Sequence, residues 1–90
     1  MHHAEVVKRD NTKEPYSEEK VRRVVEAAGL DPNQSVVFAQ AITNWLLEAE
    51  KSIINSLELR DKVLAELRST DENAANLFEW YQKTKGDVNE

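Results

Sequence analysis

The chain has 90 residues, a formal net charge of −5 and 32% charged residues. A chain this short supports one hydrophobic core rather than two, since it buries only somewhat more than about 60% of its unfolded surface. It contains no Cys, which excludes a disulfide framework and a thiolate metal site. No apolar run approaches the roughly 18 residues that span a bilayer, and the first residues lack the apolar segment of a signal peptide. We therefore expect a cytoplasmic protein.

The acidic charge is distributed unevenly along the chain. Lys and Arg balance Asp and Glu over residues 1–29, so the net charge of −5 arises in residues 30–90. A domain without a dominant basic face is a poor general binder of the nucleic-acid backbone, because that affinity comes mainly from neutralised phosphates. We expect no direct contact with nucleic acid, although a local cationic cluster is enough for a small phosphate-bearing ligand.

The N-terminal part of the chain predicts a β-hairpin. Val6 and Val7 on one side, and Lys13, Glu14 and Tyr16 on the other, flank the pair Asp10-Asn11. This pair tolerates the positive backbone angles of a two-residue turn. This predicts strands over residues 5–9 and 12–16. Pro15 has no N–H to donate to a neighbouring strand, so it should lie at a strand end or a sheet edge.

Two helices are predicted to follow the hairpin. Ser17 has the character of an N-cap for the first helix, and Gly29 ends that helix. Asp31 followed by Pro32 is a strong start signal for the second helix, because the missing N–H of a first-turn Pro costs nothing. The apolar side chains that recur at helical spacing are Val21, Val24, Val25 and Ala28 in the first helix, and Phe38, Ala41, Ile42, Trp45, Leu46 and Ala49 in the second.

The second half of the chain predicts two more helices. The residues Ile53-Ile54 between the second and third helices form either a very short strand or a buried linker. Asn55 or Ser56 can cap the third helix, and Asn55 with Glu58 has the spacing of a capping box. The apolar stripes of these helices are Leu59, Val63, Leu64 and Leu67 in the third, and Ala74, Leu77, Phe78 and Tyr81 in the fourth.

Four helices of modest length can bury their apolar stripes against each other, with the hairpin capping them. We therefore predict a mostly helical α+β domain over residues 5–85, a four-helix bundle capped by a small β-hairpin. Residues 1–4 are expected to form a flexible N-terminus and residues 86–90 a disordered tail.

Catalysis within this chain is not expected. It has no Cys nucleophile, no Gly-x-Ser-x-Gly turn, no Walker loop and no dinucleotide fingerprint. Its only histidines, His2 and His3, lie outside the predicted fold. The many carboxylates share helix faces with Lys and Arg, which favours a salt-bridged surface over an acid/base pair or a metal site.

The cationic hairpin has two interpretations. Lys8 and Arg9 point to opposite faces of a strand, and Lys20 lies in the first turn of the next helix, where free N–H groups also attract anions. These groups can surround a polyphosphate. The alternative is that the cations protect a sheet edge and pair across the hairpin with Glu5 and Glu14.

Spacing alone favours the edge-protecting interpretation. Glu18 and Glu19 lie in the first turn of the same helix, so they compete with a phosphate for its positive end. Lys13 is expected to be a solvated charge.

The stretch "VVKRDNTKEPYSEEKVRRVVEAAGL" closely resembles the start of the ATP-cone domain. That family's pattern is an apolar residue, a Lys/Arg pair, Asp-Gly, then Glu-Pro-Phe and a Lys that opens the first helix. The stretches "INSLELRDKVLAEL" and "ENAANLFEWYQKTK" are similar to the family's third and fourth helices, so the resemblance covers residues 5–85. It implies a four-helix bundle covered by a three-stranded sheet, with Ile53-Ile54 as the third strand.

The resemblance also implies a regulatory function. ATP-cone domains are allosteric modules of ribonucleotide reductase large subunits, where ATP or dATP binding changes oligomeric state and activity. They also occur in a transcriptional repressor of reductase genes. By this resemblance the effector is ATP or dATP, with Mg²⁺ left open as its companion, and the partner is an effector domain or protein such as a reductase or repressor.

A nucleotide site is implied at the hairpin, the starts of the first and third helices and the end of the fourth. Carried over by position, it comprises Val6 beside the base, Lys8 and Arg9 at the nucleotide, Glu14 and Ser17 at the base or ribose edge, Lys20 at the phosphates, Asn55 or Ser56 as a polar contact, and Lys83 and Lys85 near the phosphates. Each also has a structural interpretation, as core, helix cap, cross-strand partner or charge at a helix C-terminus.

Three positions depart from the family pattern. Asn11 replaces the turn Gly, and Asn can adopt the left-handed conformation that the turn requires. Tyr16 replaces Phe conservatively. Gln82 stands where the last helix commonly has Arg, which weakens the phosphate end of the implied site.

The sequence therefore supports two functions. The leading one is a non-catalytic allosteric domain that binds adenine nucleotide, with nucleotide-dependent homo-oligomerisation as one expected response. The alternative is a structural or protein-interaction module that keeps the cone fold but has lost nucleotide binding. An exposed Trp45 or Trp80 would be the surface signature of the alternative, because exposed apolar patches usually mark an interface.

Overall fold

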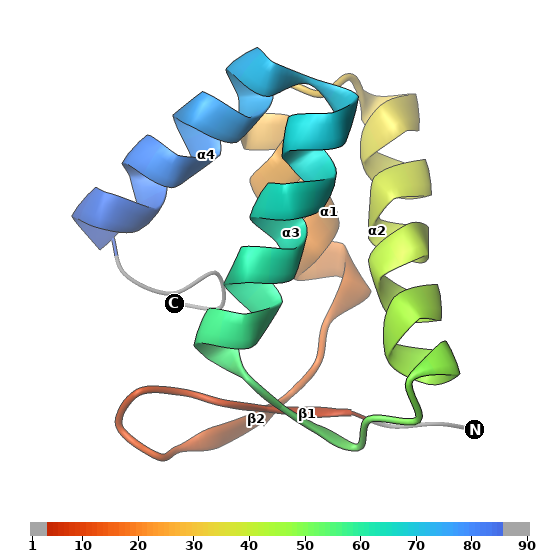
Figure 1. The fold of residues 1–90 in the computed structure, drawn as a ribbon, viewed down its shortest axis with the longest axis vertical. Helices are drawn as coiled ribbons and strands as arrows, with labels where there is room; N and C mark the ends of the chain where they lie inside the picture. The colour runs from red at the N-terminus through yellow and green to blue at the C-terminus, as the bar shows by residue number, and fades with distance from the viewer. Residues whose placement is uncertain (1–3, 86–90) are drawn as a thin grey trace.

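A computed structural model describes residues 4–85, and this part of the chain contains four helices and three short strands (Figure 1). The α+β class and the helical majority are confirmed. The elements are β1 (Glu5–Val7), β2 (Lys13–Pro15), α1 (Glu18–Ala27), α2 (Pro32–Glu48), β3 (Ile53–Asn55), α3 (Ser56–Thr70) and α4 (Glu72–Lys85). The predicted tail at 86–90 and residues 1–3 lie outside the described residues. None of the described helices is long and apolar enough to cross a membrane.

The three strands form one sheet in the order β2-β1-β3, with β1 antiparallel to β2 and parallel to β3. The third strand is therefore confirmed. Val6 lies between Glu14 on β2 and Ile54 on β3, so these three side chains share one face of the sheet. Val6 and Ile54 are buried, which identifies this face as the one against the helices. Ala4 is also buried, and its carbonyl accepts a hydrogen bond from the Tyr16 N–H at 2.8 Å.

The hairpin turn is one residue longer than predicted. The Lys8 N–H donates to the Thr12 carbonyl and the Asn11 N–H donates to the Lys8 carbonyl, both at 2.9 Å, so residues 9–11 form a three-residue loop. Within this loop Asn11 takes the positive φ, 69°, as the last residue of such loops does. Each strand of the hairpin is consequently only three residues long.

The starts of α1 and α2 are confirmed. Ser17 Oγ accepts a hydrogen bond from the Lys20 N–H at 3.2 Å and caps α1. Asp31 caps α2 by accepting from the Gln34 N–H at 2.8 Å, and the Gln34 side chain accepts from the Asp31 N–H at 3.2 Å. This reciprocal pair is a complete capping box ahead of Pro32.

The start of α3 is confirmed at Asn55, one of the two predicted caps, but without the predicted capping box. Asn55 is its N-cap, since its side-chain oxygen accepts a hydrogen bond from the Leu57 N–H at 2.8 Å. The predicted capping box with Glu58 is wrong. The Glu58 carboxylate lies 3.0 Å from Lys51 Nζ instead, because the loop before β3 places that cation beside the first turn of α3.

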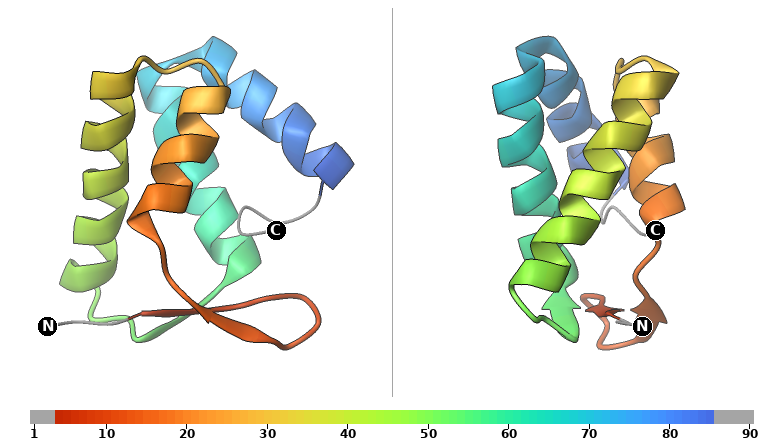
Figure 2. Two further views of the ribbon diagram at one scale, coloured as in Figure 1. Left: turned by 180° about the vertical axis from the view of Figure 1, so that it is seen from behind. Right: turned by 90° about the vertical axis from the view of Figure 1, so that its right-hand side faces the viewer.

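The helices pack mainly in two pairs, α1 with α2 and α3 with α4, with a smaller contact between α1 and α4. The four predicted helices are confirmed, whereas their arrangement as a regular bundle is not. Figures 1 and 2 show α4 leaning away from α3, while the sheet lies across the opposite end of α3. The sheet and the start of α1 therefore meet at one end of the molecule.

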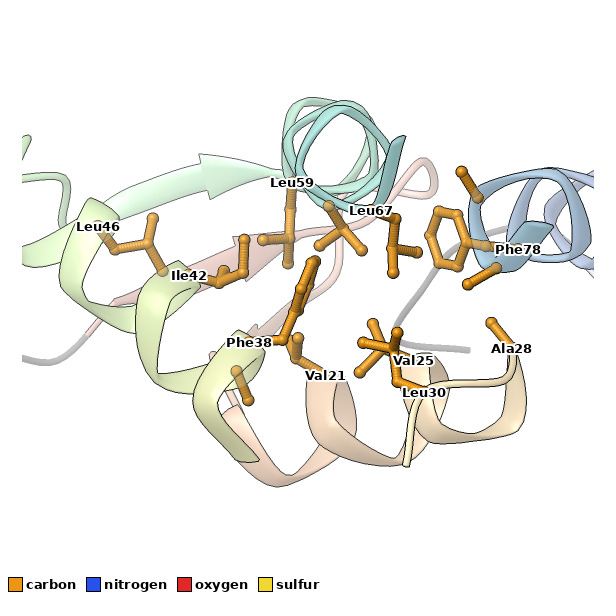
Figure 3. Close-up of a cluster of buried hydrophobic side chains, with 14 of the residues drawn as sticks. Val21, Val25, Ala28, Leu30, Phe38, Ile42, Leu46, Leu59, Leu67 and Phe78 are labelled. Carbon is orange, nitrogen blue, oxygen red and sulfur yellow. The ribbon is translucent and has the colours of Figure 1, made fainter. Parts of the chain in front are cut away.

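The core joins all four helices to the sheet. Figure 3 shows Phe38 of α2 reaching between Val21 of α1 and Leu59 of α3, and Phe78 of α4 near Leu67 and Ala28. The predicted stripes supply most of this core, whereas Ala41, Ala49 and Leu77 are exposed. Ser35, which the apolar pattern missed, is also buried, and its hydroxyl donates to the Asp31 carbonyl at 2.9 Å.

The end of α2 has a strained residue. The Glu50 N–H donates to the Leu47 carbonyl at 3.1 Å and the Lys51 N–H donates to the Leu46 carbonyl at 3.2 Å, a helix-closing turn that puts Glu50 at a φ of 54°. At the end of α1 the equivalent position is Gly29, with a φ of 123°. The positive-φ position is therefore occupied by Glu50 at the end of α2 and by Gly29 at the end of α1.

We expect Glu50→Gly to raise the free energy of unfolding. The left-handed conformation costs a residue with a Cβ about 1–2 kcal/mol, and the greater unfolded-state freedom of Gly removes about 0.5–1 kcal/mol of that gain. The net increase should be about 0.5–1 kcal/mol, measured by urea denaturation. Ala49→Gly, one residue earlier at a helical φ of −79°, should destabilise the domain. If Glu50→Gly lowers the free energy of unfolding as Ala49→Gly does, the backbone of Glu50 is not strained.

Candidate nucleotide site

The candidate site lies where the hairpin meets the starts of α1 and α3. Glu14 lies between two lysines there: Lys8 Nζ is 3.6 Å from Glu14 Oε2, and Lys20 Nζ is 3.6 Å from Glu14 Oε1. The side chains of Lys8 and Glu14 are only 22% and 21% exposed. Lys8 lies two residues beyond Val6 and therefore projects to the same face of the sheet as Val6 and Glu14. The structure thus brings four of the predicted residues together.

Two buried side-chain polar atoms in the described part of the chain have no hydrogen-bond partner, and both belong to predicted site residues. They are Glu14 Oε1 and Ser56 Oγ. Ser56 is 1% exposed and directly follows Asn55, which pairs with Val7 on β1. The great majority of buried polar groups are hydrogen-bonded. A carboxylate oxygen and a hydroxyl that make no hydrogen bond are groups that a polar ligand would satisfy.

Two other predicted residues already have a structural role. Ser17 caps α1 and Asn55 caps α3, so the capping interpretation is confirmed for both. Ser56 is the first residue of α3 and not its cap. Their positions still bring the N-termini of two helices to the sheet, and free N–H groups at a helix start favour an anion.

The remaining charges of the hairpin lie farther out. Arg9 and Lys13 are exposed, Arg9 in the turn and Lys13 on β2. Asp10 accepts hydrogen bonds from the Thr12 N–H at 3.0 Å and the Thr12 hydroxyl at 2.6 Å, and these bonds lower the pKa of Asp10. These two hydrogen bonds stabilise the turn that follows Lys8.

Glu19, which was expected to compete with a phosphate, is paired within α1. Arg22 donates to its carboxylate, through Nε at 3.1 Å, and this hydrogen bond lowers the pKa of Glu19. Arg23 Nε adds a weaker contact at 3.9 Å. These cations offset the charge of Glu19 at the start of α1.

Tyr16 connects the end of the hairpin to α2. Its hydroxyl shares a hydrogen bond of 3.0 Å with Thr43 Oγ1. Burial raises the pKa of Tyr16, so the phenol stays protonated at neutral pH. This contact helps to set the path from β2 into α1, and that path places Lys20 beside Glu14.

Lys83 and Lys85 belong to the last turns of α4, as does Gln82. Their side chains lie outside the part of the chain that the structure describes. The end of α4 lies on the side of the molecule where the hairpin turn also lies, as both Figures 1 and 2 show.

The sequence profile of the ATP cone domain matches residues 4–83. The chain belongs to the ATP-cone domain family. The transcriptional repressor NrdR of Bdellovibrio bacteriovorus is 29% identical to it over 89 residues, which cover 94% of this chain and 46% of that protein. The chain therefore spans about half the length of this curated relative. The family match and this relative point to a nucleotide-binding regulatory domain.

Sequence reasoning missed one feature of this ATP-cone domain, the pairing of Glu14 with Lys20 as well as with Lys8. The Lys8 pair follows from the hairpin and was one of the predicted alternatives. The Lys20 pair depends on how the chain turns from Pro15 into α1, for which neither spacing nor composition carries a signal.

Proposed function

We propose that this domain binds ATP or dATP as an allosteric effector. The observation that supports the proposal is the arrangement around Glu14, whose carboxylate lies between two lysine ammonium groups and has one buried oxygen, Oε1, without a hydrogen bond. Ser56 Oγ, at the start of α3 directly after β3, is a second buried polar atom without a hydrogen bond. A ligand with both a hydrogen-bond donor and several phosphates matches this combination.

Each group would have a distinct role. The adenine amino group would donate to Glu14, Lys8 would contact the nucleotide, Lys20 would contact the phosphates, and Val6 would pack beside the base. Ser56 would contact the ligand from the start of α3, and Ser17 and Asn55 would do so while capping their helices.

The outer cations of this proposal are Arg9, Lys83 and Lys85. They would approach the phosphates from the hairpin turn and from the end of α4. Charge-assisted hydrogen bonds contribute roughly 1.5–3 kcal/mol each, so two or three of them support micromolar affinity after the costs of association.

Titration calorimetry tests the proposal, with ATP, dATP, ADP and GTP and with and without Mg²⁺. We expect ATP and dATP to bind with micromolar affinity and GTP to bind more weakly. Amide chemical shifts should move in residues 6–20 and near Ser56. Absence of heat and of shift changes at millimolar ATP would exclude the proposal.

The regulated partner is proposed to be an effector domain or protein, for which the name of the repressor relative gives one example. The net charge of −5 gives this chain no general affinity for nucleic acid, so direct contact is not proposed. We expect nucleotide binding to change how the domain contacts that partner.

The second candidate function is a protein-interaction module that has lost nucleotide binding. It is favoured by α4, where Trp80 is 58% exposed and Leu77 is 42% exposed one turn earlier. A variant with Ala at Lys8, Arg9 and Lys20 separates the two functions. If partner binding is unchanged in this variant and ATP has no effect on the unsubstituted domain, the module is correct.

A further inference from the structure

The candidate site holds a carboxylate among groups that attract phosphate. Its two lysine ammonium groups and the N-termini of α1 and α3 all favour anions. Glu14 lies between the lysines, with Lys8 Nζ 3.6 Å from Oε2 and Lys20 Nζ 3.6 Å from Oε1. A site that serves any polyphosphate gains nothing from a negative charge at this place, because like charges repel.

The position of Glu14 is also unfavourable for the fold. Its side chain is 21% exposed, and Oε1 is buried without a hydrogen bond. The Lys20 contact to this oxygen is longer than a hydrogen bond, so only charge compensates for the water that Oε1 has lost. Residues that break the rule of satisfied buried polar groups are expected at functional sites. The carboxylate therefore indicates a function beyond its pairing with the lysines.

The charge of Glu14 reaches the place where Lys20 would hold a phosphate. A charge-assisted hydrogen bond is about 2.8 Å long, so a phosphate oxygen bound to Lys20 Nζ lies less than about 7 Å from Glu14 Oε1. This separation is shorter than the screening length of about 8 Å in physiological salt. Glu14 therefore repels every phosphate ligand held there, whatever else the ligand carries.

We propose that Glu14 is a selectivity residue, which rejects inorganic polyphosphates and nucleotides that lack the adenine amino group. The inference rests on the proposed function, in which that amino group donates to Glu14. A ligand with such a donor offsets the repulsion between its phosphates and the carboxylate, whereas a bare polyphosphate does not. Guanine has a carbonyl oxygen at the same ring position, so it would add a second repulsion.

Titration calorimetry of the full chain with sodium triphosphate and with ATP tests the proposal. We expect Glu14→Gln to tighten triphosphate binding by at least about tenfold, because the amide keeps the size of the side chain and removes its charge. ATP binding should tighten by less than about threefold, because its amino group loses a charged acceptor. The preference for ATP over triphosphate should therefore fall.

Two further variants separate the charge of Glu14 from its position. Glu14→Asp keeps the charge and should leave triphosphate binding weak. Glu5→Gln removes the same charge from an exposed residue that precedes Val6 on β1 and so lies on the opposite face of the sheet. Its effect on triphosphate affinity should be less than about threefold. Circular dichroism should confirm that each variant is folded.

A measurement on the unsubstituted domain requires no variant. Purine riboside triphosphate has the ring and phosphates of ATP without the amino group, so it should bind at least about tenfold more weakly than ATP. Equal affinity for the two nucleotides would overturn the inference.

The outcomes separate this inference from the proposed function. If the unsubstituted domain binds no ATP, the proposed function fails and the inference fails with it. If it binds ATP but Glu14→Gln leaves triphosphate affinity unchanged or lower, Glu14 only holds the two lysines in place. Equal tightening of triphosphate and ATP would mean that Glu14 opposes all phosphate ligands alike. Either of the last two results overturns the inference while the proposed function stands.

Discussion

Lys20→Ala is expected to weaken ATP binding by about 10- to 100-fold, since a charge-assisted hydrogen bond contributes roughly 1.5–3 kcal/mol and each 1.4 kcal/mol is a factor of ten. The substitution removes one of the two cations beside Glu14. Lys20 lies in the first turn of α1, and its backbone N–H bond to Ser17 does not need its side chain. The helix should therefore form normally, and titration calorimetry should report the loss as an affinity change alone.

Lys13→Ala is the matched control for Lys20→Ala. It removes the same charge from the adjoining hairpin, but Lys13 is exposed on β2 and should affect ATP only through long-range electrostatics. We expect its effect to be less than about threefold and to disappear at higher salt. Equal losses in the two variants would mean that ATP is held by the general charge of the hairpin and not by the cluster around Glu14.

Phe78→Ala is expected to lower the free energy of unfolding by about 3–5 kcal/mol, the usual cost of removing a buried aromatic side chain. Phe78 is 1% exposed and lies close to Leu67 and Ala28, so it connects α4 to both α3 and α1 (Figure 3). Total stabilities run from roughly 0.05 to 0.15 kcal/mol per residue, so a domain of this size has little reserve. Urea denaturation followed by far-ultraviolet circular dichroism measures the change.

Leu77→Ala tests whether the effect of Phe78→Ala comes from burial. Leu77 is the preceding residue of the same helix, and 42% of its surface is exposed. Its truncation should cost less than about 1 kcal/mol, because a large part of the side chain is already in contact with water in the folded domain. If both variants lose the same stability, burial does not explain the effect of Phe78→Ala, because Ala is the better helix former at both positions.

The local elements could be predicted from the sequence because their signals are local. Ser17 and Asp31 cap the helices that were expected, and the helical spacing of apolar residues identified most of the core. The length of the turn could not be predicted, because Asp10-Asn11 suits a two-residue loop as well as the observed three-residue loop. The capping box predicted for α3 is not formed, because the Glu58 carboxylate pairs with Lys51, which precedes β3.

The candidate site was predictable to a different degree at each residue. The pairing of Lys8 with Glu14 follows from a hairpin register that the sequence itself suggests. The burial of Ser56 depends on the parallel pairing of β1 with β3, a contact between distant segments for which only the family resemblance gave a signal. Leu77 and Trp80, in the predicted fourth helix, are exposed because the inner side of α4 is supplied by Ala74, Ala75 and Phe78.

The central place of β1 in the sheet has a consequence for the order of folding. During synthesis the hairpin emerges before the helices of this domain, but one edge of β1 has no partner until β3 is made, after both α1 and α2. Contacts between segments so far apart form late, because the intervening loop must be closed before the pairing stabilises anything. Lys8 and Ser56 therefore come together only after α1 and α2 are in place, so a partly made chain should have no affinity for the effector.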